Sequence, residues 1–142
     1  LDLYSGTGCI ALWISSKATE VIGIEENRAS VDAARIAAKL NKITNVKFIA
    51  GDTAQLLPAM TQKGYSVAVV DPPRKGLDSN VIKTITDSSL QRLIYVSCNP
   101  QSLARDITLF KNRFSVVSVQ GFDMFPHTEH IETVAMMTRV GK

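Results

Sequence analysis

The sequence is poor in the features that mark secreted, membrane-spanning and metal-binding proteins. It has only two cysteines, too few for a disulfide framework or a cysteine-based metal cluster. No apolar run approaches the ~20 residues that a membrane-spanning helix needs. The first residues resemble a strand and a Gly-rich turn rather than a basic signal peptide. We therefore expect a protein of the reducing cytoplasm, with no membrane partner and no metal.

The charge imbalance is also small. There are 16 lysines and arginines against 13 aspartates and glutamates, a net charge of +3. A nucleic-acid footprint is usually a dense basic patch, so this balance permits an RNA partner without arguing for one. The 142 residues predict one domain, and the 45% of hydrophobic residues suffice for a core. Because the chain begins inside an apolar strand without an initiator methionine, we expect a fragment whose upstream part is missing.

Short β-rich runs alternate with helical stretches. The expected strands are 1–4, 20–25, 46–50, 66–70, 93–97, 115–122 and 133–138. The expected helices are 10–16, 28–40, 54–61, 80–87 and 101–112. The helix over 28–40 has the clearest pattern, with Val31, Ala34, Ile36 and Ala38 as its apolar positions and Asn41 as its stop.

This alternation predicts an α/β protein with a mostly parallel sheet. No helix fits between Phe122 and Thr133, so the last two strands should form an antiparallel hairpin at one sheet edge. Five alternating units followed by such a hairpin fit the Rossmann-like class I fold of S-adenosylmethionine-dependent methyltransferases. They fit a dinucleotide dehydrogenase less well.

A Gly-rich turn follows the first expected strand, in the segment DLYSGTG. Gly6 and Gly8 allow a tight turn and a close approach of the backbone to a ligand, although they also suit an ordinary strand-to-helix turn. Tyr4 could line a cofactor pocket or belong to the core. The turn lacks a third glycine, which favours a cofactor without a pyrophosphate.

Two acidic residues strengthen the cofactor interpretation. Glu25 ends the second expected strand, where a carboxylate can accept hydrogen bonds from both ribose hydroxyls of an adenosine. Asp52 follows the third strand and could accept from an adenine amino group, or cap the next helix. Together with the Gly turn, these positions favour S-adenosylmethionine over a nicotinamide cofactor.

The segment VVDPPRKGL follows the fourth expected strand. Ligands bind open α/β sheets at the carboxyl ends of their strands, and Asp71 occupies such an end. Pro72 and Pro73 cannot continue a central strand, so they should direct Asp71 and Arg74 toward the ligand crevice. A rigid turn without a functional role is the alternative.

Cys98 follows the fifth expected strand, in YVSCNP. Most cysteines are buried and inert, but a helix N-terminus favours the thiolate form, and this cysteine precedes a helix. The segment MFPHTEHIE adds His127, His130 and Glu132 beside the edge hairpin. Glu132 could serve as a general base, with Glu129 as a rival, and either could be a surface charge.

One reaction uses a cysteine, a base and a methyl sulfonium together. The C5 carbon of uracil is a poor nucleophile, but a thiolate that adds to C6 makes an enolate with electron density at C5. C5 can then accept the methyl group. A carboxylate must afterwards remove the C5 proton before the thiolate leaves. Cys98, Glu132 and the cofactor residues supply these three requirements.

The segments DPPRKGL, SCNP and MFPHTEHIE, in this order after DLYSGTG, resemble the RNA 5-methyluridine methyltransferases that act on tRNA and 23S ribosomal RNA. The resemblance covers the whole chain as that family's C-terminal catalytic domain. Among the possible substrates we place 23S ribosomal RNA slightly ahead of tRNA, and we expect no protein partner.

The resemblance implies a role for each matching residue. Cys98 is the nucleophile and Glu132 the base that removes the C5 proton. Arg74 orients the site or meets an RNA phosphate, and Asp71 contacts the cofactor, the target base or both. The remaining implied cofactor contacts are Tyr4, Gly6, Gly8, Glu25 and Asp52.

The sequence departs from the family at three points. Cys9 stands where relatives often have Asn or Thr. The upstream cofactor motif and the RNA-binding segments of relatives are absent, and so are the four cysteines of an iron–sulfur cluster. Two alternatives remain open: a cytosine-5 RNA methyltransferase, which the lack of a cysteine at the end of the fourth strand disfavours, and a non-catalytic cofactor- or RNA-binding module.

Overall fold

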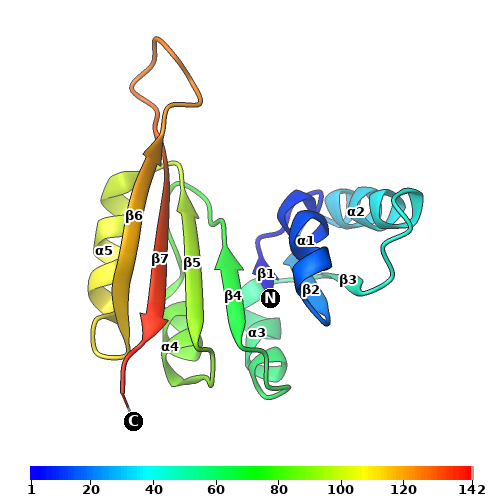
Figure 1. Cartoon of the computed structure of the whole chain (residues 1–142), viewed down its shortest axis with the longest axis horizontal. Coiled ribbons are helices and arrows are strands. Elements are labelled where there is room, and N and C mark those ends of the chain that lie inside the picture. The colour runs from blue at the N-terminus through cyan, green and yellow to red at the C-terminus, as the bar shows by residue number, and fades with distance from the viewer. Residues whose placement is uncertain (142) are drawn as a thin grey trace. The chain divides into compact units, whose positions relative to one another are not determined.

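The computed structural model describes residues 1–141, which form two compact units, Leu1–Leu56 and the described residues from Leu57 onward. Figure 1 shows the elements of both. In the first unit, the strands β1 (Asp2–Leu3), β2 (Val21–Glu25) and β3 (Val46–Ala50) pair parallel in the order β3-β2-β1. The helices of this unit are α1 (Cys9–Ile14), followed by a 3-10 turn (Ser15–Lys17), and α2 (Arg28–Leu40). A further helix, α3 (Thr53–Thr61), begins here and ends in the second unit.

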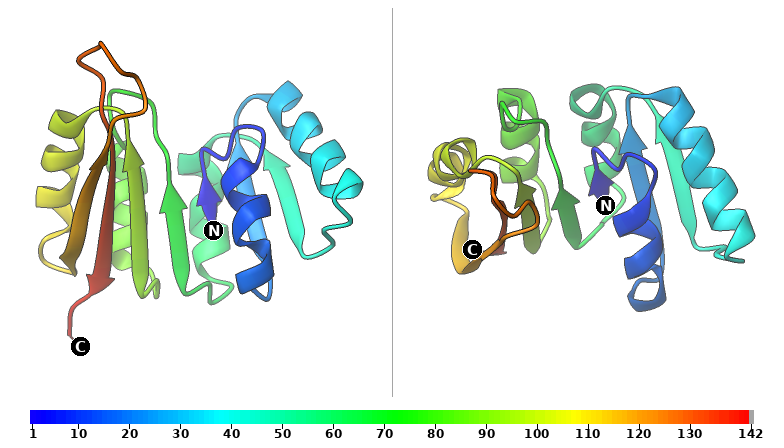
Figure 2. Two further views of the ribbon diagram at one scale, coloured as in Figure 1. Left: turned by 45° about the horizontal axis from the view of Figure 1, so that its top comes forward. Right: turned by 90° about the horizontal axis from the view of Figure 1, so that it is seen from above.

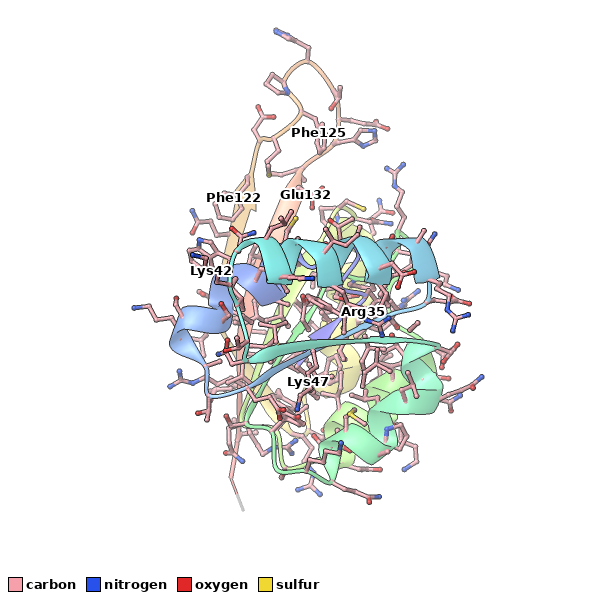
Figure 3. The ribbon with its side chains drawn as sticks, turned by 90° about the vertical axis from the view of Figure 1, so that its right-hand side faces the viewer. Arg35, Lys42, Lys47, Phe122, Phe125 and Glu132 are labelled. Atoms are coloured by element: carbon pink, nitrogen blue, oxygen red, sulfur yellow. The ribbon has the colours of Figure 1, made fainter. Side chains whose placement is uncertain are left out.

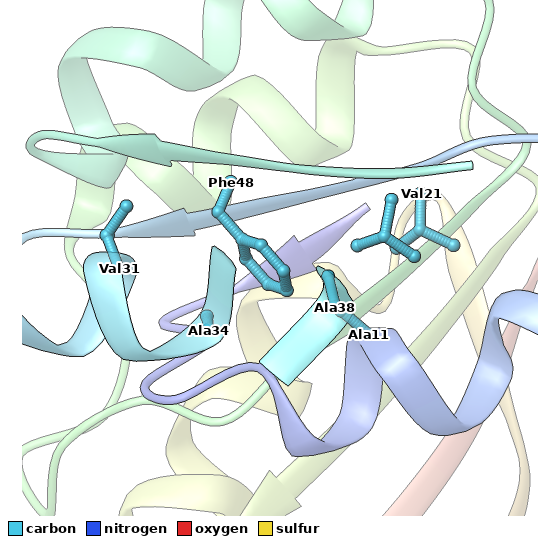
Figure 4. Close-up of a cluster of buried hydrophobic side chains, with 7 residues drawn as sticks. Ala11, Val21, Val31, Ala34, Ala38 and Phe48 are labelled. Carbon is cyan, nitrogen blue, oxygen red and sulfur yellow. The ribbon is translucent and has the colours of Figure 1, made fainter. Parts of the chain in front are cut away.

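A small apolar core holds the helices of the first unit against its strands. It consists of Ala11, Val21, Val31, Ala34, Ala38, Val46 and Phe48, and Figure 4 shows the Phe48 ring between α2 and the strands. The core-facing positions of α2 are Val31, Ala34 and Ala38, at helical spacing. Ile36, which we expected on the apolar face, is 61% exposed because it lies two residues, about 200°, around the helix from Ala34.

The second unit contains the strands β4 (Val67–Val70), β5 (Arg92–Ser97), β6 (Phe114–Phe122) and β7 (Glu132–Arg139), in the order β4-β5-β7-β6. β4 and β5 are parallel, whereas β7 runs antiparallel to both β5 and β6. The helices α4 (Ser79–Asp87) and α5 (Pro100–Phe110) cover the same face of these strands (Figure 2). The expected elements therefore form, with boundaries shifted by one or two residues in most cases.

The antiparallel hairpin of β6 and β7 is confirmed, and Figure 1 shows its connecting loop, residues 123–131, projecting past the ends of the strands. No helix interrupts this connection, as the sequence predicted. None of the helices in residues 1–141 is long and apolar enough to span a membrane.

Candidate functional site

Three predicted residues lie at one edge of the second unit's sheet. Because β4 and β5 are parallel, Asp71, which follows β4, and Cys98, which follows β5, lie at the same carboxyl edge. β7 begins at that edge, with Thr133 opposite Ser97. Cys98 and Glu132 are the next residues beyond this last pair, so both lie at the same end of the β5–β7 ladder.

A pocket of about 440 Å³ opens beside Cys98. Its lining residues come from the loop after β4, the start of α5 and the β6–β7 loop: Arg74, Cys98, Asn99, Pro100, Gln101, Glu129 and His130. Cys98 is half-buried and forms no disulfide. The sulfur is therefore held in the wall of a pocket rather than sealed inside the core, as a nucleophile requires.

Asn99 connects two walls of this pocket. Its side-chain oxygen accepts a hydrogen bond from the Gln101 N–H at 3.1 Å and so caps α5, which begins with Pro100. Its side-chain amide donates to the carbonyl oxygen of Arg74 at 3.0 Å. The residue that starts the helix after Cys98 therefore also holds the loop that carries Arg74.

Arg74 reaches the opposite wall of the pocket, where its guanidinium lies 3.2 Å from Nδ1 of His130. A guanidinium only donates hydrogen bonds, so Nδ1 accepts and the imidazole carries its proton on Nε2. The Phe125 ring packs edge-on against His130, with centroids 6.4 Å apart. Figure 3 shows Phe125 within the projecting loop and Glu132 at its base.

Asp71 and Glu132 influence each other electrostatically. Asp71 is an exposed residue, but partial loss of solvent around its carboxyl raises the pKa above its usual value, and the negative charge of Glu132 raises it further. Glu132 is half-buried at the start of β7. Glu129 lines the pocket wall, whereas Glu132 lies at the strand edge with Asp71.

In the first unit, Glu25 holds the Gly-rich turn. One carboxylate oxygen accepts from the Gly6 N–H at 3.0 Å, and the other accepts from the Asn27 N–H at 2.7 Å. Each carboxylate oxygen has two acceptor positions, so Glu25 keeps capacity for ligand hydroxyls. Tyr4 lies just past β1 rather than in it, half-buried, with a φ of 63° that non-glycine residues seldom adopt.

The two glycines of the turn differ in their surroundings. A Cβ atom at Gly6 would meet nothing within 4 Å, whereas one at Gly8 would lie 2.5 Å from the Phe48 ring. Ser5, the neighbour of Gly6, has a buried hydroxyl that no described residue hydrogen-bonds. Gly6 therefore faces open space, while Gly8 permits close packing on Phe48.

Asp52 caps a helix, one of the two roles that the sequence allowed. Its side-chain oxygen accepts from the Gln55 N–H at 2.9 Å, at the start of α3. The residue is exposed. The Gly51 N–H, just before it, donates to the Glu25 carbonyl at 2.9 Å, so Asp52 and Glu25 lie close together at the ends of β3 and β2.

Three residues of the second unit were not identified from the sequence: Tyr95, Arg105 and Asp106. Asp106 is fully buried and accepts hydrogen bonds from the Tyr95 hydroxyl and the Leu77 N–H. The only signal in the sequence is an aspartate on the apolar side of α5. Among residues 1–141, no three His, Cys, Asp or Glu side chains gather closely enough to hold a metal ion.

Comparison with known proteins agrees with this geometry. The model of the tRNA (uracil-5-)-methyltransferase family matches residues 1–140. The chain belongs to this family. An uncharacterized RNA methyltransferase of Leptospira interrogans is 41% identical over 139 residues, which are 98% of this chain and 35% of that protein. Another, from Enterococcus faecalis, is 43% identical over 142 residues, 98% of this chain and 31% of that protein.

A family enzyme of known structure has the same fold. The tRNA (uracil-54, C5)-methyltransferase of Pyrococcus abyssi, crystallised with S-adenosyl-L-homocysteine, superposes with a TM-score of 0.87 at 30% identity. The match covers 96% of this chain and 33% of that one. This confirms the expected Rossmann-like methyltransferase fold. The chain spans about a third of the length of the relatives that it matches.

Proposed function

We propose that the protein containing this chain methylates C5 of a uridine in RNA, with S-adenosylmethionine as methyl donor and Cys98 as covalent catalyst. The observation that carries the proposal is the position of Cys98: half-buried in a pocket wall, at the sheet edge that also holds Asp71 and Glu132. Membership of the uracil-5 methyltransferase family supports the reaction type.

The residues of the Gly-rich turn fit the cofactor. The open space at Gly6 suits a ligand that approaches the backbone. Glu25 and Asp52 supply acceptors for ribose hydroxyls and an adenine amino group. When bound there, S-adenosylmethionine supplies an electrophilic methyl group. The Pyrococcus relative, crystallised with the demethylated cofactor, supports this choice.

Cys98 starts the reaction as a thiolate. Its sulfur forms a bond to C6 of the uracil, and the C5–C6 π electrons move onto C5 and the O4 carbonyl as an enolate. S-adenosylmethionine, when bound, would supply the methyl carbon to C5, and the electron pair of the broken S–CH3 bond would stay on sulfur, leaving S-adenosylhomocysteine. Arg74, across the pocket, can stabilise the negative charge on the ring or a nearby phosphate. Asp71 contacts the cofactor or the uracil.

Glu132 completes the reaction as the base. It takes the C5 proton, the electron pair of the C5–H bond re-forms the C5–C6 double bond, and the sulfur leaves C6 with the electrons of its bond. The strand register supports Glu132, because the last paired residues, Ser97 and Thr133, are the chain neighbours of Cys98 and Glu132. Glu129 is the alternative base, because it lines the same pocket.

For the RNA substrate we propose 23S ribosomal RNA or tRNA. The sequence resemblance slightly favours 23S ribosomal RNA over tRNA. The Pyrococcus relative acts on tRNA uracil-54, which supports tRNA as the other substrate. Full-length protein offered both transcripts in parallel distinguishes them by which one acquires 5-methyluridine.

The covalent step is tested with RNA that contains 5-fluorouracil. Fluorine at C5 cannot leave as a proton does, so the methylated adduct cannot eliminate and a protein–RNA complex persists. We expect this complex in the presence of S-adenosylmethionine and none with Cys98→Ala, while Cys9→Ala, the other thiol, still forms it. A complex that survives in Cys98→Ala would exclude Cys98 as the nucleophile.

The identity of the base is tested with ordinary uridine RNA. Glu132→Gln should methylate the base but keep it bound to Cys98, because the C5 proton stays in place. Glu129→Gln, the matched variant, should release methylated RNA. Trapping by Glu129→Gln and normal release by Glu132→Gln would move the role to Glu129.

A further inference from the structure

Asp106 forms the centre of a buried polar network that lies outside the pocket. Its side chain is fully buried. One oxygen accepts from the Tyr95 hydroxyl at 2.6 Å and from the Leu77 N–H at 2.8 Å. The other accepts from the Arg105 guanidinium, at 2.9 Å from Nε and 2.6 Å from a terminal nitrogen. A buried carboxylate needs such partners, and this one has four.

The network ties the loop after β4 to the helix after Cys98. Two residues of α5 and its capping residue form hydrogen bonds with backbone groups of loop residues 74, 75 and 77. The Asn99 amide donates to the carbonyl of residue 74 at 3.0 Å, and the Arg105 guanidinium donates to the carbonyl of residue 75 at 2.8 Å. Asp106 accepts from the N–H of residue 77.

Gly76 makes this close approach possible. Its φ is +85°, and a Cβ atom there would lie about 2.4 Å from a terminal Arg105 nitrogen and 2.6 Å from the Asp106 oxygen. The loop therefore lies directly on the two charged groups, with no room for a side chain between them. Any displacement of Asp106 would be transmitted to the loop backbone.

Tyr95 anchors the carboxylate from the sheet side. It is a fully buried residue of β5, three positions before Cys98. Burial, followed by the hydrogen bond to Asp106 and then by the Asp106 charge, raises the pKa of Tyr95 well above its usual range. The hydroxyl thus remains protonated and donates to Asp106. Strand β5, helix α5 and the Arg74 loop converge on a single carboxylate.

We propose that Asp106, held by Tyr95 and Arg105, is a positioning residue that sets the place of Arg74 relative to Cys98 during methyl transfer. The inference rests on the proposed function, because it assigns the network a role in that reaction. Tyr95, Arg105 and Asp106 do not line the pocket that contains Cys98. Arg105 contacts the loop after β4 through the Lys75 carbonyl.

The test is Tyr95→Phe in the full-length protein, which removes one hydroxyl and keeps the ring that fills the core. The rate of adduct formation with 5-fluorouracil RNA is measured under single-turnover conditions at saturating RNA and S-adenosylmethionine. We expect the rate of adduct formation to fall roughly 10- to 100-fold, because a catalytic group displaced by about 1 Å can reduce the rate by this much. The RNA concentration for half-saturation should change little.

Phe110→Leu is the matched control for general destabilisation. Phe110 is a fully buried residue at the far end of the same helix and packs edge-on against Phe114, with ring centroids 5.9 Å apart. This variant should lower the melting temperature at least as much as Tyr95→Phe, yet keep the adduct rate. Equal rate losses in the two variants would overturn the positioning role.

A double-mutant cycle shows whether the network acts through Arg74. In an Arg74→Lys background, Tyr95→Phe should lower the adduct rate by less than about twofold, because the group being positioned is already altered. A full additional loss would overturn the inference. Failure of the wild-type protein to form any adduct would instead overturn the proposed function, so the two failures are distinguishable.

Discussion

At the scale of single residues, Gly6 and Gly8 show that two glycines of one motif can have different reasons to be there. Both have positive φ angles, 52° and 83°. Only Gly8 also lacks space, because the Phe48 ring would lie 2.5 Å from its Cβ. The motif therefore combines a packing requirement with an open ligand-facing position.

Gly8→Ala should destabilise the fold more than Gly6→Ala. Strain at a positive φ costs about 1–2 kcal/mol in either variant, and overpacking against Phe48 adds about 1–3 kcal/mol at position 8. Urea unfolding followed by circular dichroism measures both. Equal losses of unfolding free energy would mean that the Phe48 ring moves aside without cost.

Asp71 gives the protein a stability that depends on pH. Its folded-state pKa is raised above the ordinary value for an aspartate, so the folded state holds the proton more tightly than the unfolded state. This contribution favours folding below the ordinary Asp range and is lost as pH rises through the raised folded value. The free energy of unfolding of the wild type, relative to Asp71→Asn, should therefore fall as the pH rises from the ordinary Asp pKa to the raised folded-state pKa.

Chemical unfolding of wild type and Asp71→Asn across the acidic range measures that difference. The second cause of the shift provides a control, because Glu132→Gln removes the neighbouring negative charge. When Glu132→Gln is present in both proteins, the pH-dependent difference in unfolding free energy between Asp71 and Asp71→Asn should become smaller. Parallel stability curves for wild type and Asp71→Asn would show that the pKa of Asp71 is not raised.

At the scale of secondary-structure elements, helix caps explain why the boundaries form where they do. Asn27 caps α2 by accepting from the Ser30 N–H at 3.1 Å, and Asn99 caps α5 in the same manner. Only Asn99 has a second task, its hydrogen bond to the Arg74 carbonyl. The Asn27 side chain therefore only caps its helix, whereas the Asn99 side chain caps its helix and also holds the Arg74 loop.

Asn27→Ala and Asn99→Ala should lose similar stability, about 1 kcal/mol each, because each removes one cap. Only Asn99→Ala should slow adduct formation with 5-fluorouracil RNA, because it also releases the Arg74 loop. Thermal melts and single-turnover assays on the same preparations separate the two effects. Equal assay rates for both variants would contradict a positioning contribution from Asn99.

At the scale of the whole chain, β6 exposes a row of apolar side chains. Val117 is 59% exposed and Val119 56%, on a strand at the end of its sheet. Exposed apolar edge strands promote association between copies. The chain 1–142 prepared alone should therefore self-associate, and Val117→Lys with Val119→Lys should reduce this, as measured by light scattering. Identical scattering by both forms would contradict the prediction.

The order of elements was predictable because local pattern determines it. The apolar pattern of Val31, Ala34, Ile36 and Ala38 predicted α2 at its observed bounds, although Ile36 is exposed. The absence of a helix between the last two strands predicted their antiparallel pairing. The strand-end positions of Asp71 and Cys98 follow from the same reasoning, since parallel strands share a carboxyl edge.

The sequence by itself determined the fold class, the family resemblance and the residue types available for catalysis, because these depend on periodicity and on short motifs. Only the tertiary structure decided which groups touch. The pairing of Arg74 with His130, and the attachment of the Arg74 loop to Asp106, join residues far apart in the chain. No local pattern encodes such contacts, because they arise from strand register and helix packing.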